Sequence, residues 1–199
     1  MLHSLTKLLE VLFPPRPSQV LVRTCAINDI IYRAICKESI WYTTSYSSPL
    51  VRALIIENKF HRNTRASDIL GQLINSFVAQ HNLQSAVFVS IPLSQKRQRM
   101  RGYNQVDNIL HSLVLTKHQP LHRSKDTTPQ TQLERAARLH NMKGAFSVNQ
   151  SVITTISQHK TIVLVDDVFT TGATLKEARA ALNPHLPDET KIICLALAH

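Results

Sequence analysis

Two adjacent carboxylates and a threonine-rich turn are the residues of this chain whose types and spacing point most directly to chemistry. Asp166 and Asp167 follow the apolar run 162–165 and precede a turn that contains Gly172. Threonine hydroxyls donate and accept hydrogen bonds, and a glycine lets the main chain approach an anion closely. The carboxylates repel a phosphate, but they accept hydrogen bonds from hydroxyl groups or bind a metal ion that the substrate brings. The stretch therefore predicts a site for a ligand with hydroxyl groups and a phosphate.

A buried strand followed by a helix is the structure expected around these residues. The run 162–165 is rich in β-branched side chains, as in a parallel strand buried on both faces, and apolar residues recur at helical spacing over 175–182. A helix N-terminus attracts anions because its first N–H groups are unpaired and its dipole is positive there. Ligands of open α/β sheets bind at the carboxyl ends of strands, where this turn falls. The alternative is an ordinary strand and a helix capped by Thr170 or Thr171.

The stretch 161–175 resembles the phosphoribosyl pyrophosphate (PRPP) motif of type I phosphoribosyltransferases. It has an apolar run, two acidic residues, two further positions and then Thr-Thr-Gly-Ala-Thr, whereas G-x-x-x-x-G-K-[ST] and G-x-G-x-x-G are absent. The resemblance implies that Asp166 and Asp167, the expected catalytic pair, hold the ribose and that the turn holds the 5′-phosphate. Asp166 and Asp167 are also the candidate ligands for magnesium that PRPP brings. The residues implied to bind these two groups are Asp166, Asp167, Val168, Phe169, Thr170, Thr171, Gly172, Ala173 and Thr174.

A strongly basic segment follows another expected strand. Residues 86–91 form an apolar run that Pro92 ends, and four of the six residues 96–101 are cationic. A loop after a parallel strand reaches the same sheet edge as the acidic pair, and guanidinium groups match phosphate oxygens. We expect this loop to bind the pyrophosphate of PRPP; the alternatives are a solvated surface loop and a nucleic-acid surface on which Tyr103 stacks. The candidate pyrophosphate ligands are Lys96, Arg97, Arg99, Arg101 and Gly102.

Apolar periodicity elsewhere predicts helices that alternate with strands. With right-handed crossovers, this order gives an α/β fold with a mostly parallel twisted sheet and helices on both faces. The resemblance implies that this fold is type I phosphoribosyltransferase-like, with a small N-terminal or hood segment. The expected division is an N-terminal segment, 1–48, and a phosphoribosyltransferase-like domain, 49–199. Further helices are expected over 2–12, 49–60, 66–80 and 131–142, and another follows the basic segment and runs to about 115. Strands are expected over 41–44, 120–122, 144–148 and 191–197, and the last of them is expected to close the sheet.

The charge balance favours acidic partners. The 199 residues include 23 Lys and Arg against 13 Asp and Glu, a formal charge of +10. Such an excess attracts anions, and both PRPP and single-stranded DNA are anionic. The three cysteines form no C-x-x-C pair, no apolar run reaches the length of a membrane span, and no secretory signal is evident. These features predict a reduced, cytoplasmic protein without a membrane span.

The wider pattern of motifs resembles the ComF/GntX family of phosphoribosyltransferase-like proteins, which includes ComFC-like competence proteins. The elements that carry the resemblance are I-P-L at 91–93, R-G-Y-N-Q at 101–105, G-A-F at 144–146 and the PRPP motif, and Tyr103 stands where Phe is usual. The resemblance implies PRPP-dependent transfer linked to natural competence and DNA uptake. The candidate hood or acceptor residues are Lys59, Asn104, Gln105, Gln130, Arg138 and Asn141.

The N-terminal segment departs from that family, which commonly begins with a zinc ribbon. Here Phe-Pro-Pro-Arg at 13–16 is followed by Pro17, and only Cys25 and Cys36 remain in the region. Two thiols cannot fill a tetrahedral zinc site. We therefore expect a degenerate segment without zinc.

Two functions remain open on the sequence. In the first, the protein transfers a phosphoribosyl group from PRPP to an unidentified acceptor and releases pyrophosphate, in connection with DNA uptake. In the second, it is a non-catalytic factor that binds PRPP or single-stranded DNA.

Overall fold

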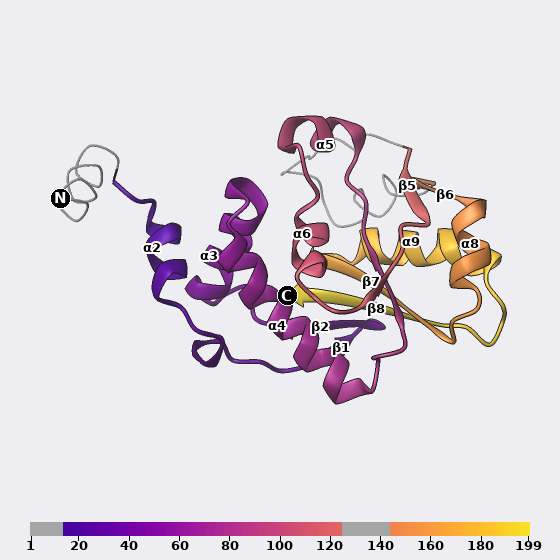
Figure 1. The fold of residues 1–199 in the computed structure, drawn as a ribbon, viewed down its shortest axis with the longest axis horizontal. Coiled ribbons are helices and arrows are strands. Elements are labelled where there is room, and N and C mark those ends of the chain that lie inside the picture. The colour runs from indigo at the N-terminus through magenta and orange to yellow at the C-terminus, as the bar shows by residue number, and fades with distance from the viewer. Residues whose placement is uncertain (1–13, 125–143) are drawn as a thin grey trace.

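A mostly parallel sheet organises the computed structural model, which describes residues 14–124 and 144–199 (Figure 1). The strand order is β1-β2-β8-β7-β3-β4, and every neighbouring pair is parallel except the β1–β2 hairpin. A separate antiparallel pair, β5–β6, lies beside it. The strands are β1 (Ile35–Lys37), β2 (Ile40–Thr44), β3 (Val87–Ser90), β4 (Thr116–Lys117), β5 (Leu121–Arg123), β6 (Phe146–Val148), β7 (Thr161–Val168) and β8 (Lys191–Ala198).

Helices cover both faces of this sheet, as expected. On one face lie α2, α3, α4 and α6, and on the other lie α8 and α9. The helices are α2 (Pro17–Thr24), α3 (Pro49–His61), α4 (Thr64–His81), α5 (Gln95–Arg101), α6 (Gln105–His111), α8 (Gln150–Ile156) and α9 (Ala173–Leu182), with short 3₁₀ turns at Ile27–Asp29 and Asn183–His185.

The apolar run of β7 serves both layers because successive side chains of a strand point to opposite faces. Ile162 and Leu164 belong to the core cluster under α8 and α9, whereas Val163 and Val165 belong to the cluster under α3, α4 and α6. All four side chains are fully buried. A run of four apolar residues therefore marks a central strand with helices on both sides, as the sequence predicted.

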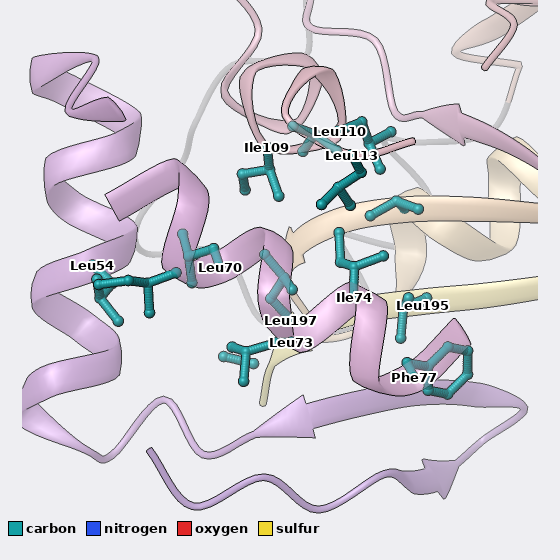
Figure 2. Close-up of a cluster of buried hydrophobic side chains, with 14 of the residues drawn as sticks. Leu54, Leu70, Leu73, Ile74, Phe77, Ile109, Leu110, Leu113, Leu195 and Leu197 are labelled. Atoms are coloured by element: carbon teal, nitrogen blue, oxygen red, sulfur yellow. The ribbon is translucent and has the colours of Figure 1, made fainter. Parts of the chain in front are cut away.

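The larger cluster lies between α4, α6 and the sheet (Figure 2). Ile74 and Phe77 of α4 face Leu195 of β8, and Leu110 of α6 packs into the same cluster. The wide apolar stripe of α4, predicted over 66–80, is what fixes this helix to the sheet.

Two segments differ from expectation. The basic segment expected as a loop is the short helix α5, because Lys, Arg, Gln and Met favour helices and the Ser94 hydroxyl accepts a hydrogen bond from the Arg97 amide at 3.4 Å. Gly102, with φ 78°, ends it. Residues 17–24, over which the sequence predicted no helix, form α2, with Pro17 as its first residue. The helices expected over 2–12 and 131–142 lie outside the described residues.

The strand β8 does not close the sheet, contrary to expectation. It pairs with β7 on one side and with β2 on the other, and the hairpin partner β1 forms the edge. The sheet thus contains strands from both the N-terminal segment expected over 1–48 and the domain expected over 49–199. No helix in the described ranges combines the length and apolar character needed to cross a membrane.

Truncation of Phe77 to Ala should destabilise the protein by about 3–5 kcal/mol, because it removes a fully buried ring and leaves a cavity. The matched variant is Phe60→Ala on α3, whose ring is 61% exposed and whose removal should change stability by less than about 0.5 kcal/mol. Urea unfolding measures both. Equal losses of stability would contradict the packing described for α4.

Candidate functional site

The acidic pair lies at the carboxyl end of β7, where the sequence placed it. The Asp166 carboxylate accepts a hydrogen bond from the Asp167 amide at 2.9 Å, and the Asp167 carboxylate accepts one from the Val168 amide at 2.9 Å. The Asp167 side chain is only 8% exposed. Burial, reinforced by the neighbouring Asp167 carboxylate, raises the pKa of Asp166 from 3.8 to about 8. A half-buried and a buried carboxylate side by side favour ligands that donate hydrogen bonds or carry positive charge.

Three segments meet at the Asp167 carboxylate. Lys59, near the end of α3, places its Nζ 3.6 Å from Asp167 Oδ2, and Gln105, at the start of α6, donates from Nε2 to the same oxygen at 3.1 Å. Arg101, at the end of α5, donates in turn to Gln105 Oε1. Burial lowers the pKa of Arg101, and the Asp167 charge opposes that shift, as expected for neighbouring opposite charges. The structure thus brings together residues that the sequence had assigned to separate subsites.

The turn after β7 leads directly into α9. Gly172 has φ 71°, and a Cβ there would lie 2.4 Å from Ile40 Cδ1 and 2.9 Å from Phe169 Cε2. Glycine is therefore required by both conformation and packing, in addition to the close approach to an anion that the sequence suggested. Ala173 is the first residue of α9, and its amide donates to the Thr171 hydroxyl at 3.4 Å.

The remaining residues of the turn divide into buried and open positions. Phe169 is buried and stacks on His199, with ring centroids 4.5 Å apart, so its side chain anchors the turn. Val168 packs against the larger core cluster. Thr170 is exposed and Thr174 is half-buried. The hydroxyls of the turn, rather than these two apolar side chains, are the groups available to a ligand.

The candidate pyrophosphate residues spread over α5. Lys96 and Arg99 are exposed, and Arg97 is half-buried. Arg101 turns toward Gln105, and Gly102 ends the helix. These cations therefore do not all converge on one point.

Asn104, one of the candidate hood or acceptor residues, has a structural role in the fold. The Asn104 side chain caps α6, since it accepts from the Val106 amide at 3.0 Å and donates to the Ile91 carbonyl at 3.0 Å. It therefore holds the loop after β3 in place. Gln130, Arg138 and Asn141 lie outside the described residues.

A pocket of about 400 Å³ lies beside the loop after β3, the strand next to β7. Asp107 of α6 accepts a hydrogen bond from Ser90, and Gln119 donates to the same Ser90 hydroxyl at 2.9 Å. Burial raises the pKa of Asp107. The pocket is lined by Pro92, Leu93, Arg99, Asp107, Gln119 and Arg123, among others.

A buried polar group on α3 was not predicted from the sequence. Glu57 and Asn58 are 0% and 1% exposed and stand just before Lys59. The signal was present, since a carboxylate and an amide interrupt the apolar side of a helix, and buried polar groups need partners. In the described ranges no group of three or more His, Cys, Asp and Glu side chains is arranged to hold a metal ion.

The raised pKa of Asp166 predicts a stability that depends on pH. A carboxyl group whose pKa rises from 3.8 to about 8 on folding supports the folded state only at low pH, and this contribution is lost as pH rises through 8. The free energy of unfolding of Asp166→Asn, relative to that of the wild type, should therefore increase by at least about 1 kcal/mol from pH 5 to pH 9. Urea unfolding at both values measures the gain, with Asp188→Asn, an exposed position, as control. If the variant and the wild type differed in stability by the same amount at pH 5 and pH 9, the raised pKa of Asp166 would be contradicted.

Comparisons with known proteins identify a domain family and several related proteins. A family described as the phosphoribosyl transferase domain matches residues 114–199. The DNA utilization protein YhgH of Escherichia coli is 29% identical over 163 residues, which are 77% of this chain and 70% of that protein. Competence protein F of Haemophilus influenzae is 29% identical over 157 residues, 76% of this chain and 68% of that protein. Competence protein ComFC of Bacillus subtilis is 34% identical over 96 residues, 48% of this chain and 38% of that protein. Residues 114–199 therefore match the phosphoribosyl transferase domain, and the chain is similar in sequence to YhgH, competence protein F and ComFC.

Proposed function

We propose that the protein binds PRPP at the carboxyl end of β7 and transfers its phosphoribosyl group to an acceptor. The observation that carries this proposal is the adjacent pair Asp166 and Asp167, followed at once by the threonine-bearing turn and the N-terminus of α9. The ribose hydroxyls donate to the two carboxylates, and the 5′-phosphate accepts from the turn hydroxyls and the first amides of α9. One ligand satisfies both halves of the site.

Pyrophosphate leaves C1 of the ribose as the acceptor bonds to that carbon. Lys59 pairs with Asp167, the charge of Arg101 interacts with it, and Arg99 lines the pocket next to β3. These groups stabilise the charge that develops on the leaving group. The pocket has the size of a small-molecule site and contains both Asp107 and two arginines, so it is our candidate for the pyrophosphate or the acceptor.

Magnesium fits the chemistry of the site. Carboxylate oxygens are ligands that Mg²⁺ prefers, and this ion usually binds with substrate phosphates and a small number of protein carboxylates. Asp166 and Asp167 are the residues that would hold it, together with PRPP oxygens. When bound, the ion neutralises charge on the pyrophosphate. We do not assign zinc to the N-terminal segment, where Cys25 is buried and Cys36 is exposed.

The biological setting follows from the relatives. Their names refer to DNA utilization and competence, and we propose that this chain acts in the uptake or use of DNA inside the cell. The acceptor would then belong to that process.

A second candidate function is binding of single-stranded DNA, and one surface favours it. Phe60 is 61% exposed, and Lys59 and Arg101 lie over its ring at 5.8 and 5.6 Å from the centroid. Arg62 lies over Tyr103 at 5.5 Å. Exposed aromatic rings between cations are the groups on which bases stack while phosphates are neutralised.

The double variant Asp166→Asn with Asp167→Asn should weaken PRPP binding at least about 100-fold, because each carboxylate loses charge-assisted hydrogen bonds worth about 1.5–3 kcal/mol. Calorimetric titration with PRPP and magnesium measures the affinity. The matched control is Asp188→Asn with Glu189→Gln, an exposed acidic pair just before β8 at the opposite end of the sheet. Normal binding by the Asp166 and Asp167 variant would rule out this site.

Charge reversal on α5 tests the DNA-binding function. Arg97→Glu with Arg99→Glu should weaken binding of a fluorescent oligothymidylate. The slope of log affinity against log salt concentration should also become shallower, by roughly 0.7 for each phosphate that the protein no longer neutralises. The control is Lys160→Glu with Lys191→Glu, which makes the same charge change at the adjoining amino ends of β7 and β8. Equal weakening in the two variants would show that overall charge, and not α5, attracts DNA.

A further inference from the structure

Glu57 is a fully buried carboxylate that the catalytic proposal does not use. It accepts hydrogen bonds from Arg16 Nε at 3.1 Å, Arg16 Nη2 at 2.9 Å, Ser18 Oγ at 2.7 Å and Asn63 Nδ2 at 3.3 Å. Burial by itself would raise the pKa of Glu57, but the hydrogen bonds from Arg16, Ser18 and Asn63 outweigh it and lower the pKa to about 2. The carboxylate is therefore ionised and held from several directions at neutral pH.

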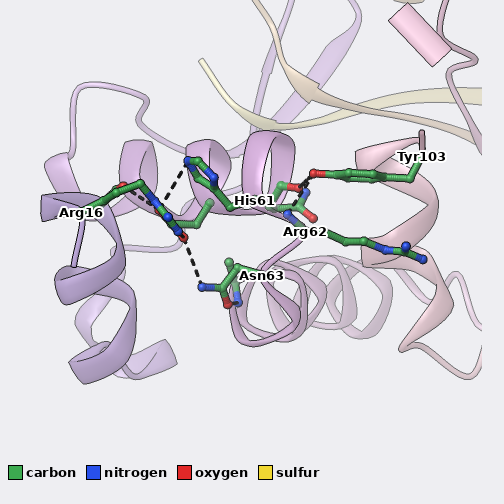
Figure 3. Close-up of polar contacts among 9 residues, drawn as sticks. Arg16, His61, Arg62, Asn63 and Tyr103 are labelled. Atoms are coloured by element: carbon green, nitrogen blue, oxygen red, sulfur yellow. Dashed lines mark hydrogen bonds and ion pairs between the residues drawn. The ribbon is translucent and has the colours of Figure 1, made fainter. Parts of the chain in front are cut away.

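These partners come from the starts of two helices, and Glu57 adds the end of a third (Figure 3). Arg16 and Ser18 belong to the start of α2, and Asn63 is the residue that caps α4, where its Oδ1 accepts from the Ala66 amide at 3.1 Å. Glu57 itself lies in the last turns of α3. One carboxylate thus joins the start of α2, the end of α3 and the start of α4.

The two residues after Glu57 contact the candidate PRPP site. Asn58 Nδ2 donates to the Gln105 carbonyl at 3.0 Å, and Lys59 pairs with Asp167. Gln105 donates its own side-chain amide to Asp167. Both groups that reach Asp167 Oδ2 therefore depend on where the end of α3 lies.

Tyr103 holds the same turn from the opposite side. Its hydroxyl donates to the Asn58 carbonyl at 2.9 Å and accepts from the Arg62 amide at 2.9 Å, and Figure 3 shows the ring reaching α3 from the segment after α5. The end of α3 is thus fixed between α2 and the Tyr103 segment. On the α2 side, the attachment is made through a buried charge.

We propose that Glu57 is a positioning residue for the PRPP site: its bond to Arg16 of α2 sets the place of Lys59 and Gln105 on Asp167. The proposal rests on the proposed function, because it makes PRPP affinity depend on the attachment of α2. It assigns the N-terminal region a role in the site without any direct contact between α2 and the ligand.

The variant Arg16→Met tests this role. It leaves the Glu57 carboxylate buried without its guanidinium partner, and PRPP affinity should fall about tenfold, equivalent to about 1.4 kcal/mol. The milder variant Ser18→Ala, which removes the 2.7 Å bond, should shift affinity in the same direction and guards against misfolding of the first variant.

Arg65→Met is the matched control. Arg65 attaches the other end of α2, through the Val22 carbonyl at 2.9 Å and the Cys25 carbonyl at 2.8 Å, and does not contact Glu57. Its removal should change PRPP affinity less than about twofold, well under 1 kcal/mol. An equal fall in affinity in the Arg16 and Arg65 variants would overturn the proposal, because general loosening of α2 would then explain both.

A double-mutant cycle shows whether Arg16 acts through Lys59. If it does, Arg16→Met should weaken PRPP binding less in a Lys59→Met background than in the wild type. Additive effects would contradict the proposed route.

The last measurement does not require PRPP. In ¹H–¹⁵N spectra of the unliganded protein, Arg16→Met should shift the Gln105 side-chain amide and the Asp167 backbone amide, whereas Arg65→Met should leave them in place. Unchanged signals in the Arg16 variant would overturn the positioning role. Failure of the wild type to bind PRPP would instead refute the proposed function, and these spectra would still decide the link from α2 to Asp167.

Discussion

The removal of two adjacent carboxylates from water, one buried and one half-buried, is the constraint on which the rest of the site depends. An ionised carboxylate removed from water is costly unless hydrogen bonds or cations compensate it. Asp167 obtains such partners from Lys59 and Gln105, which arrive on different helices. Asp166 accepts a hydrogen bond from the Asp167 amide, and burial raises its pKa. The site is thus incompletely compensated within the protein, which is the condition expected of a surface that gains by binding a ligand.

The layered fold explains how distant residues reach this point. Parallel strands end at one edge of the sheet, so the loop after β3 and the turn after β7 are neighbours. The helix α3 lies beside α2 and ends near the same edge (Figure 1). Polar contacts then join half-exposed Arg16 to buried Glu57, and join the next two residues of α3 to Gln105 and Asp167. Stability of the helix packing and order in the site are therefore parts of one arrangement.

Local features of the sequence predicted the centre of the fold and of the site. The run 162–165, the acidic pair and Gly172 are contiguous, so their roles can be inferred from short-range chemistry, and the stripe of α4 has a clear helical period. Long-range contacts were harder to predict from the sequence. The ion pair of Lys59 with Asp167, the burial of Glu57 and the addition of β2 beside β8 depend on tertiary packing. The helix α5 was missed because a run of cations is also typical of a solvated loop.

The pairing of β2 with β8 has a consequence for the biosynthesis of the protein. The Thr43 hydroxyl donates to the Leu197 carbonyl, across 154 positions of the chain. During translation, β1 and β2 leave the ribosome long before β8, and α3 and α4 lack the sheet face that they cover. Long-range parallel pairing is slow, and apolar surfaces stay open until it is complete. Ribosome-bound chains that lack residues 191–198 should therefore be substrates for chaperones that recognise exposed apolar helices.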